Sequence, residues 1–189
     1  MLILNLSFLM CAAETGNDDL LNYVNSYRQE HGEAGLIRSS LLDNAAKIQA
    51  EIMCMTNVLT HDGNNESNKT VGSRAVMSGY SFSTIAENVA MLTFNSANEA
   101  FNLWRASPGH KKNMLAQNAN AGYAYCTGGD GNIYYCMVYG TPLDGPQKNA
   151  EPASIDANVK SAFAGGNNNP TTGEPQIPQS LIDLNLQQS

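Results

Sequence analysis

Apolar residues in the first part of the chain recur every three to four positions, which is the spacing of one face of an amphipathic helix. The pattern predicts a first helix over residues 18–31, which Gly32 ends, and a second helix from Ser40. It also predicts a short helix over residues 73–78 and a longer helix from Ser96. Helices therefore dominate this part of the chain.

Two of these helices begin with a serine and carry an acidic residue three positions later. Asp43 follows Ser40 in this way, and Glu99 follows Ser96. The spacing is that of a capping box, in which the two side chains satisfy backbone N–H groups at the helix start.

The helix from Ser96 runs into the segment Ser107-Pro108-Gly109-His110. Proline disfavours helical backbone in the residue before it, so we expect this helix to end near Ser107. Glycine then lets the chain turn freely. Such a turn would fix the direction of the His110 side chain.

Tyrosine-rich segments at residues 120–126 and 132–140 flank the sequence TGGDG, a pattern typical of a β-hairpin. Helices come first and antiparallel strands come late. This order indicates an α+β fold, in which amphipathic helices cover a small antiparallel sheet.

The cysteines depend on the register of this hairpin. If residues 127–131 form the loop, Cys126 lies opposite Asn132 and Cys136 lies opposite Gly122. The two cysteines are then about 13 Å apart along the ladder. A disulfide between Cys126 and Cys136 is not expected at that separation.

Composition indicates one globular domain with a different C-terminal segment. Apolar residues make up 42% of the 189 residues, enough for a core, and the net charge is −7. Lysines and arginines are scattered, which argues against a nucleic-acid-binding surface. Residues 143–189 are rich in Asn, Gly, Pro, Gln and Ser without periodicity, so we expect a disordered tail or linker there. The folded domain is expected over residues 14–142.

Residues 1–13 form an apolar run that is too short to span a bilayer. The run ends in the small residues Ala12 and Ala13, which predicts a secretory signal and removal of Cys11 with it. A positively charged start is missing, so a disordered or core-packed N-terminus is the alternative. No later stretch is long and apolar enough for a transmembrane helix.

The polar segment THDGNNESNKT, residues 60–70, follows the second helix. It contains two N-x-S/T patterns, at Asn65 and Asn68, which are glycosylation acceptors in a secreted eukaryotic protein. It also contains His61, one of four residues that draw attention as a candidate site.

The other three candidates are Glu87, Ser107 and His110. Glu87 lies in the otherwise apolar segment IAENVA, where a buried carboxylate needs a partner. Two histidines and a carboxylate suit a zinc or other divalent cation site with open positions. They suit a hydrogen-bonded polar cluster equally well, because their spacing fits no local metal or nucleophile motif.

The segments THDG, AENVA, LWRASPGHKKNML and YYCMVYGTP occur in this order. Together they resemble the CAP superfamily, which includes cysteine-rich secretory proteins, insect venom antigens and plant pathogenesis-related proteins. The similarity covers roughly residues 18–142. It implies a three-layer α-β-α sandwich around an antiparallel sheet. It also implies a central cleft with two histidines and two acidic residues, able to hold a divalent cation.

His61, Glu87 and His110 match three of those four cleft positions. The fourth matches Ser107, and the W..SPGH form is similar to microbial members of the superfamily. With one carboxylate fewer, we expect low, reversible cation affinity, with His61 and His110 as the metal ligands. Two imidazoles favour zinc over calcium or magnesium. The family's aromatic GH.T..VW signature and its cysteine-rich C-terminal module are both missing, so channel blocking is not implied.

The resemblance implies a secreted, non-enzymatic protein that binds a sterol or another lipid or acts at an extracellular interface. One alternative is a metal-dependent extracellular hydrolase, with Glu87 as general base toward a bound water. The other is a structural extracellular domain with a polar core cluster. Related plant proteins also imply a Cys54–Cys126 disulfide from helix to sheet, with Cys136 left free because its partner position matches Ala121. The oligomeric state does not follow from the sequence.

Overall fold

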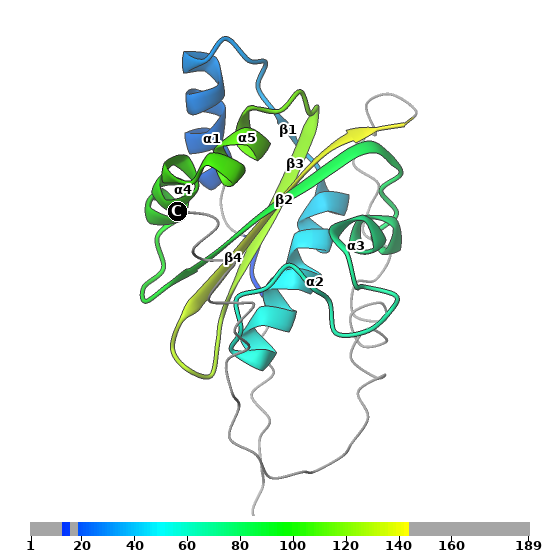
Figure 1. Ribbon diagram of the computed structural model, residues 1–189, viewed down its shortest axis with the longest axis vertical. Coiled ribbons are helices and arrows are strands. Elements are labelled where there is room, and N and C mark those ends of the chain that lie inside the picture. Colours follow the sequence, from blue (N-terminus) through cyan, green and yellow to red (C-terminus); the bar gives the residue numbers. More distant parts are fainter. Residues whose placement is uncertain (1–12, 16–18, 144–189) are drawn as a thin grey trace, which may run out of the picture.

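The structure is a computed structural model that describes residues 13–15 and 19–143 (Figure 1). The predicted tail therefore lies outside the described residues except for Leu143, and so does the predicted signal except for Ala13. The elements, in chain order, are α1 (Asp19–Glu30), β1 (Ile37–Arg38), α2 (Ser40–Thr56), α3 (Val71–Met77), β2 (Phe82–Leu92), α4 (Ala97–Ala106), α5 (Pro108–Leu115), β3 (Asn120–Thr127) and β4 (Ile133–Pro142).

The sheet has the strand order β1-β3-β4-β2, with α2 and α3 on one face and α1, α4 and α5 on the other (Figure 1). Each face has its own apolar cluster of buried side chains. This is the α+β fold that the sequence pattern predicts and the three-layer sandwich that the family resemblance implies. The sheet is mixed rather than wholly antiparallel, because the short strand β1 runs parallel to β3.

Strand β2 was not predicted, although it is the longest strand and forms one edge of the sheet. Its central residues are buried on both faces, so the alternation of polar and apolar positions that marks a half-exposed strand is missing. Successive side chains of the strand still point to opposite faces of the sheet. Glu87 and Val89 point toward the α2 face, where Val89 joins the α2 cluster, and Asn88 and Ala90 point toward the opposite layer.

The predicted helices form, with two differences at their starts. The cap of α2 is Ser39, which makes no side-chain capping bond, so the expected box at Ser40 is wrong. Asp43 instead accepts a hydrogen bond from the Tyr123 backbone N–H at 2.9 Å, because α2 packs directly on β3. At α4 the prediction is half right, since Ser96 Oγ accepts from the Glu99 N–H at 3.2 Å.

Ser107 ends α4, as expected, but the chain does not turn freely after it. Ser107 is at once the C-cap of α4 and the N-cap of α5, and Pro108 occupies the first turn of the new helix. Proline is well suited to that position because its missing N–H has no partner there anyway. His110 therefore stands on a helix rather than on a Pro-Gly turn.

The hairpin register differs by two residues from the one predicted. Cys126 lies opposite Tyr134 and Cys136 opposite Ala124, because Thr127 still pairs with Ile133 inside the ladder. The loop closes one residue later than expected, with the Gly128 N–H donating to the Asn132 carbonyl at 2.8 Å.

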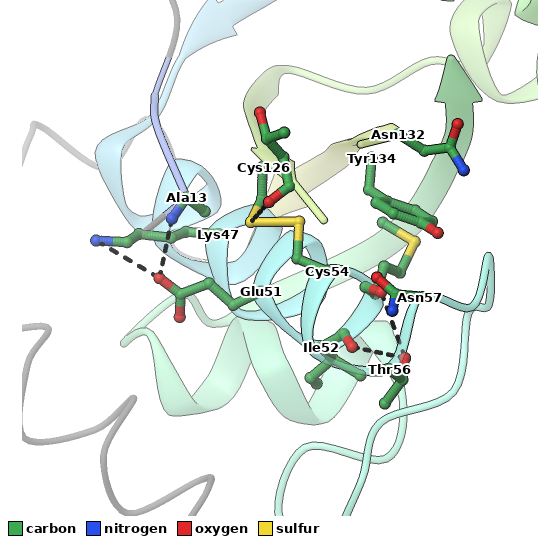
Figure 2. The surroundings of a disulfide bond; sticks show 12 residues. Ala13, Lys47, Glu51, Ile52, Cys54, Thr56, Asn57, Cys126, Asn132 and Tyr134 are labelled. Atoms are coloured by element: carbon green, nitrogen blue, oxygen red, sulfur yellow. Dashed lines mark hydrogen bonds and ion pairs between the residues drawn. A yellow bond between two sulfur atoms is a disulfide. The ribbon is translucent and has the colours of Figure 1, made fainter. Parts of the chain in front are cut away.

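The Cys54–Cys126 disulfide is confirmed and joins α2 to the end of β3, with a Cα–Cα distance of 6.0 Å (Figure 2). Cys136 is free and buried, also as expected. Ala13 lies nearby, buried against α2, with its N–H donating to Glu51 Oε1 at 3.3 Å (Figure 2). Within the described part of the chain, no helix is long and apolar enough to cross a membrane.

Candidate functional site

The four candidate residues come from opposite layers of the sandwich. His61 follows α2 and lies on the α2 face with the Glu87 side chain, whereas Ser107 and His110 belong to the start of α5 on the other face. β2 carries Glu87 and is an edge strand. The two layers can therefore approach each other around this edge without a strand in between.

Glu87 and His61 are in direct contact. His61 Nδ1 lies 2.8 Å from Glu87 Oε1, and the Glu87 side chain is only 3% exposed. An ionised carboxylate is only an acceptor, so the hydrogen belongs on Nδ1. This assignment leaves Nε2 of His61 as the ring nitrogen with a lone pair when the imidazole is neutral.

Arg74 is the site residue that the sequence did not reveal. Its side chain is fully buried in α3, and its Nη2 lies 2.7 Å from Glu87 Oε2. The guanidinium also donates to the backbone carbonyls of Asn68 at 2.9 Å and His61 at 3.2 Å. It therefore fixes both the carboxylate and the loop that carries the histidine.

The charge state of Glu87 reflects these partners. Burial alone would raise its pKa, but the hydrogen bond from His61 and the charge of Arg74 outweigh burial and lower it. The Cys136 thiol also donates to Glu87 Oε2, at 3.4 Å, and burial raises the pKa of that thiol well above its usual value. The site thus holds an ionised carboxylate beside a neutral thiol.

Asn68 organises the loop before α3. Its side chain is fully buried, its Oδ1 accepts from the backbone N–H groups of Asn64 and Asn65, and its Nδ2 donates to Asn64 Oδ1 at 2.8 Å. A glycan on Asn68 is incompatible with this packing. Asn65, the other acceptor by pattern, is partly exposed.

His110 has an unusual environment. Its Nε2 is buried and has no hydrogen-bond partner among the described residues. Burial, with a contribution from the nearby charge of His61, lowers the pKa of His110 to about 4. The imidazole is therefore neutral at physiological pH.

Ser107 is also buried, at 7% exposure, and its Oγ has no hydrogen-bond partner within the described residues. The structure thus joins His61 to Glu87, and it connects His110 to the next strand residue, Asn88, whose Nδ2 donates to the His110 carbonyl at 3.1 Å. It shows no hydrogen bond from the Ser107 side chain to any of them within the described residues. The sequence could not show which of the four residues meet. Apart from Ser107 and His110, they are distant from one another along the chain.

A metal ion fits this arrangement only in part. Among residues 13–15 and 19–143, no three His, Cys, Asp or Glu side chains are grouped so that they could hold one. Both oxygens of Glu87 already bind His61 and Arg74, so the carboxylate is not free to ligate. What remains are two imidazoles, His61 and His110, which suit a weak site for a metal that prefers nitrogen ligands.

Comparisons with known proteins agree with this fold. The family model described as CAP, cysteine-rich secretory protein family, matches residues 21–139, more than half of the chain. An outer surface protein from Borrelia burgdorferi superposes with a TM-score of 0.58 at 18% identity, covering 69% of this chain and 98% of that one.

An extracellular protein containing a SCP domain from Bacillus anthracis str. Ames superposes with a TM-score of 0.57 at 22% identity. The superposition covers 66% of this chain but only 39% of the Bacillus protein. None of the curated proteins matches the sequence. At these identities the likeness to the solved structures concerns the fold.

Proposed function

The chain belongs to the cysteine-rich secretory protein (CAP) family, and from this premise we propose that it is an extracellular, non-catalytic binding domain whose His61 and His110 take zinc reversibly. The location outside the cell is supported by its structural relatives, an outer surface protein and an extracellular protein. The zinc proposal rests on the site itself.

The observation that carries the proposal is the buried, unpartnered Nε2 of His110. A buried polar nitrogen without a hydrogen bond is costly, and a ligand or a water commonly satisfies such an atom. Because the pKa of His110 is lowered to about 4, its imidazole is neutral, and a metal ligand must be neutral imidazole.

Glu87 supports the proposal because it orients one of the two proposed metal ligands. Its carboxylate binds the Nδ1–H of His61, which leaves Nε2 of that ring for coordination. A carboxylate that orients a histidine in this way is a common feature of zinc sites. Zinc would supply Lewis acidity when bound, but two protein ligands predict modest affinity and no role in folding.

The hydrolase alternative receives less support. It needs Glu87 as a general base, yet the carboxylate is held by Arg74 and His61, and its pKa is lowered. A low pKa makes a carboxylate a weak base at neutral pH. The sterol or lipid ligand implied by the family stays a prediction, which lipid extraction from the purified protein would test.

Calorimetric titration of the full chain with zinc chloride at neutral pH tests the zinc proposal. We expect binding by the unaltered protein and at least a tenfold loss in His61→Ala and in His110→Ala. The matched control is His31→Ala, because His31 follows α1 with its Nδ1 bound to the Tyr27 carbonyl at 2.8 Å. That variant should bind zinc normally. Equal binding by the His61→Ala/His110→Ala double variant would overturn the proposal.

Chelation provides a second measurement. Removal of zinc with a chelator should leave the melting temperature nearly unchanged, since a two-ligand site adds little to folding. Calcium should not replace zinc in the titration, because it prefers oxygen ligands. A cooperative unfolding on chelation would show that the metal is structural and would contradict the weak-site proposal.

A further inference from the structure

Helix α5, which carries His110, is joined to the sheet largely through amide side chains. Met114 is its only buried residue, so little apolar surface fixes its position. The polar contacts near His110 come from Asn88 on β2 and Asn113 on α5, and at the other end of the helix the buried Arg28 donates to the Met114 carbonyl at 2.7 Å. Asn88 is fully buried and points to the α5 side of the sheet.

Both polar atoms of the Asn88 side-chain amide make hydrogen bonds in this interface. Its Nδ2 donates to the His110 backbone carbonyl at 3.1 Å and lies 3.2 Å from the Tyr139 hydroxyl. Its Oδ1 accepts from Asn113 Nδ2 at 2.9 Å. The contact to His110 is made to the very residue whose ring forms half of the proposed zinc site.

Asn113 completes the connection through the edge of β2. Its Nδ2 also donates to the Glu87 backbone carbonyl at 3.1 Å. The same Glu87 holds His61 through its carboxylate on the other face of the strand. One strand residue is therefore bonded to the histidine of one layer and to the helix that carries the histidine of the other layer.

We infer that Asn88 and Asn113 are positioning residues that hold α5, and with it His110, against the part of β2 that carries Glu87. Hydrogen bonds are directional, so the two amides fix the rotation of the start of this short helix, where His110 lies, whereas Arg28 holds its C-terminal end. Loss of the Asn88 amide leaves the carbonyl of His110 and the amide of Asn113 without this partner. The helix can then shift, and the spacing of the two imidazoles changes. Only the zinc readout of this inference rests on the proposed function.

The test compares Asn88→Ala with the matched control Asn120→Ala in the full chain. Asn120 is also buried, accepts from the Tyr80 hydroxyl at 3.0 Å and donates to the Ile37 carbonyl at 3.2 Å, at a part of the sheet where no candidate residue lies. Both variants lose a buried amide with similar partners. A general loss of stability therefore affects both, whereas a positioning effect belongs to Asn88→Ala.

Two readouts are needed. The first is the NMR chemical shift of the His110 ring protons at a fixed neutral pH, which reports the surroundings of the ring and requires no metal. We expect these chemical shifts to change in Asn88→Ala and to stay unchanged in Asn120→Ala. The second is zinc affinity by calorimetry, with a loss of roughly tenfold to hundredfold in Asn88→Ala. In a His110→Ala background, Asn88→Ala should cause no further loss of zinc affinity.

The outcomes separate the inference from the zinc proposal. If the His110 ring chemical shifts change in Asn88→Ala but the unaltered protein binds no zinc, the positioning role stands and the zinc proposal fails. Unchanged His110 ring chemical shifts in folded Asn88→Ala, or an equal change in Asn120→Ala, overturn the positioning role. If Asn88→Ala does not fold, Asn113→Ala decides by the same readouts, because Asn113 is only partly buried.

Discussion

Removing the charge of Glu87 should destabilise the protein strongly, and the reason lies in Arg74. In Glu87→Gln the shape of the side chain is kept and an acceptor for His61 remains. Arg74, however, keeps its charge inside the protein with both side chains almost fully buried, 0% exposed for Arg74 and 3% for Glu87. Two backbone carbonyls remain as acceptors for the guanidinium, but no negative charge does.

The size of the effect follows from that burial. Breaking a buried ion pair by removing one partner costs about 3–5 kcal/mol. This is a large part of the roughly 5–15 kcal/mol by which a domain is stable. With an m-value of about 2 kcal/mol/M, the urea midpoint should fall by about 2 M. Urea unfolding at pH 7, followed by far-ultraviolet circular dichroism, measures this shift.

Glu66→Gln is the control. Glu66 also pairs with a cation, Lys69 at 3.4 Å, but its side chain is 91% exposed and the pair is screened by solvent. We expect no measurable change there. A midpoint shift in Glu87→Gln no larger than in Glu66→Gln would refute the argument that burial makes the Arg74 pair strong. In addition, Arg74→Met combined with Glu87→Gln should be less destabilised than the sum of the two single variants.

The pH dependence of this effect has a definite sign. The folded pKa of Glu87 lies below the ordinary value of 4.5. The carboxylate therefore stabilises the fold fully above pH 4.5, and this contribution is lost as the pH falls through the lower, folded value. The stability difference between the unaltered protein and Glu87→Gln should shrink as the pH falls below 4.5.

Three further predictions concern other parts of the fold. The Cys54→Ala/Cys126→Ala double variant opens a loop of 72 residues and should lose about 4 kcal/mol in urea unfolding; a loss below about 1 kcal/mol would contradict the entropic estimate. Because the folded pKa of His110 is about 4 against 6.5 when unfolded, stability should fall by about 1–2 kcal/mol as the pH drops through that window. In His110→Gln this pH-dependent loss of stability should be absent, and an unchanged loss would show that other groups cause it. Gly122→Ala places a methyl group against the α2 backbone and should cost about 2 kcal/mol or more. Gly129→Ala, whose methyl group would only come into ordinary contact with the Asn57 side chain at 4.0 Å, should be neutral by thermal melting.

The sequence predicted much of the local structure, because the spacing of apolar residues in helices and the presence of turn residues are local signals. The start of α2 at Ser40, the end of α4 at Ser107 and the tyrosine-rich hairpin all appear where the pattern places them. The hairpin register was wrong by two residues, since it depends on which loop residue closes the turn. β2 was not predicted because a strand buried on both faces has no alternation of polar and apolar residues.

Local sequence signals predicted the candidate site only in part. The pattern singled out His61, Glu87 and His110, and the structure brings His61 to Glu87. It gave no hint of Arg74, which looks like an ordinary polar residue of a short helix, or of Asn88, which follows Glu87 as one more polar position.

What the sequence alone determined is most of the helices, the hairpin and the residue types available for chemistry, and the family resemblance implied which cysteine stays free. Only the tertiary structure decided which side of β2 each residue faces, that Arg74 neutralises Glu87, and that His110 lies in the layer opposite His61. The physical reason is separation along the chain. Glu87 meets Arg74 across 13 residues and His61 across 26, and Asn88 meets His110 across 22. Contacts over such distances depend on how the layers pack around the sheet edge, and no local period encodes that packing.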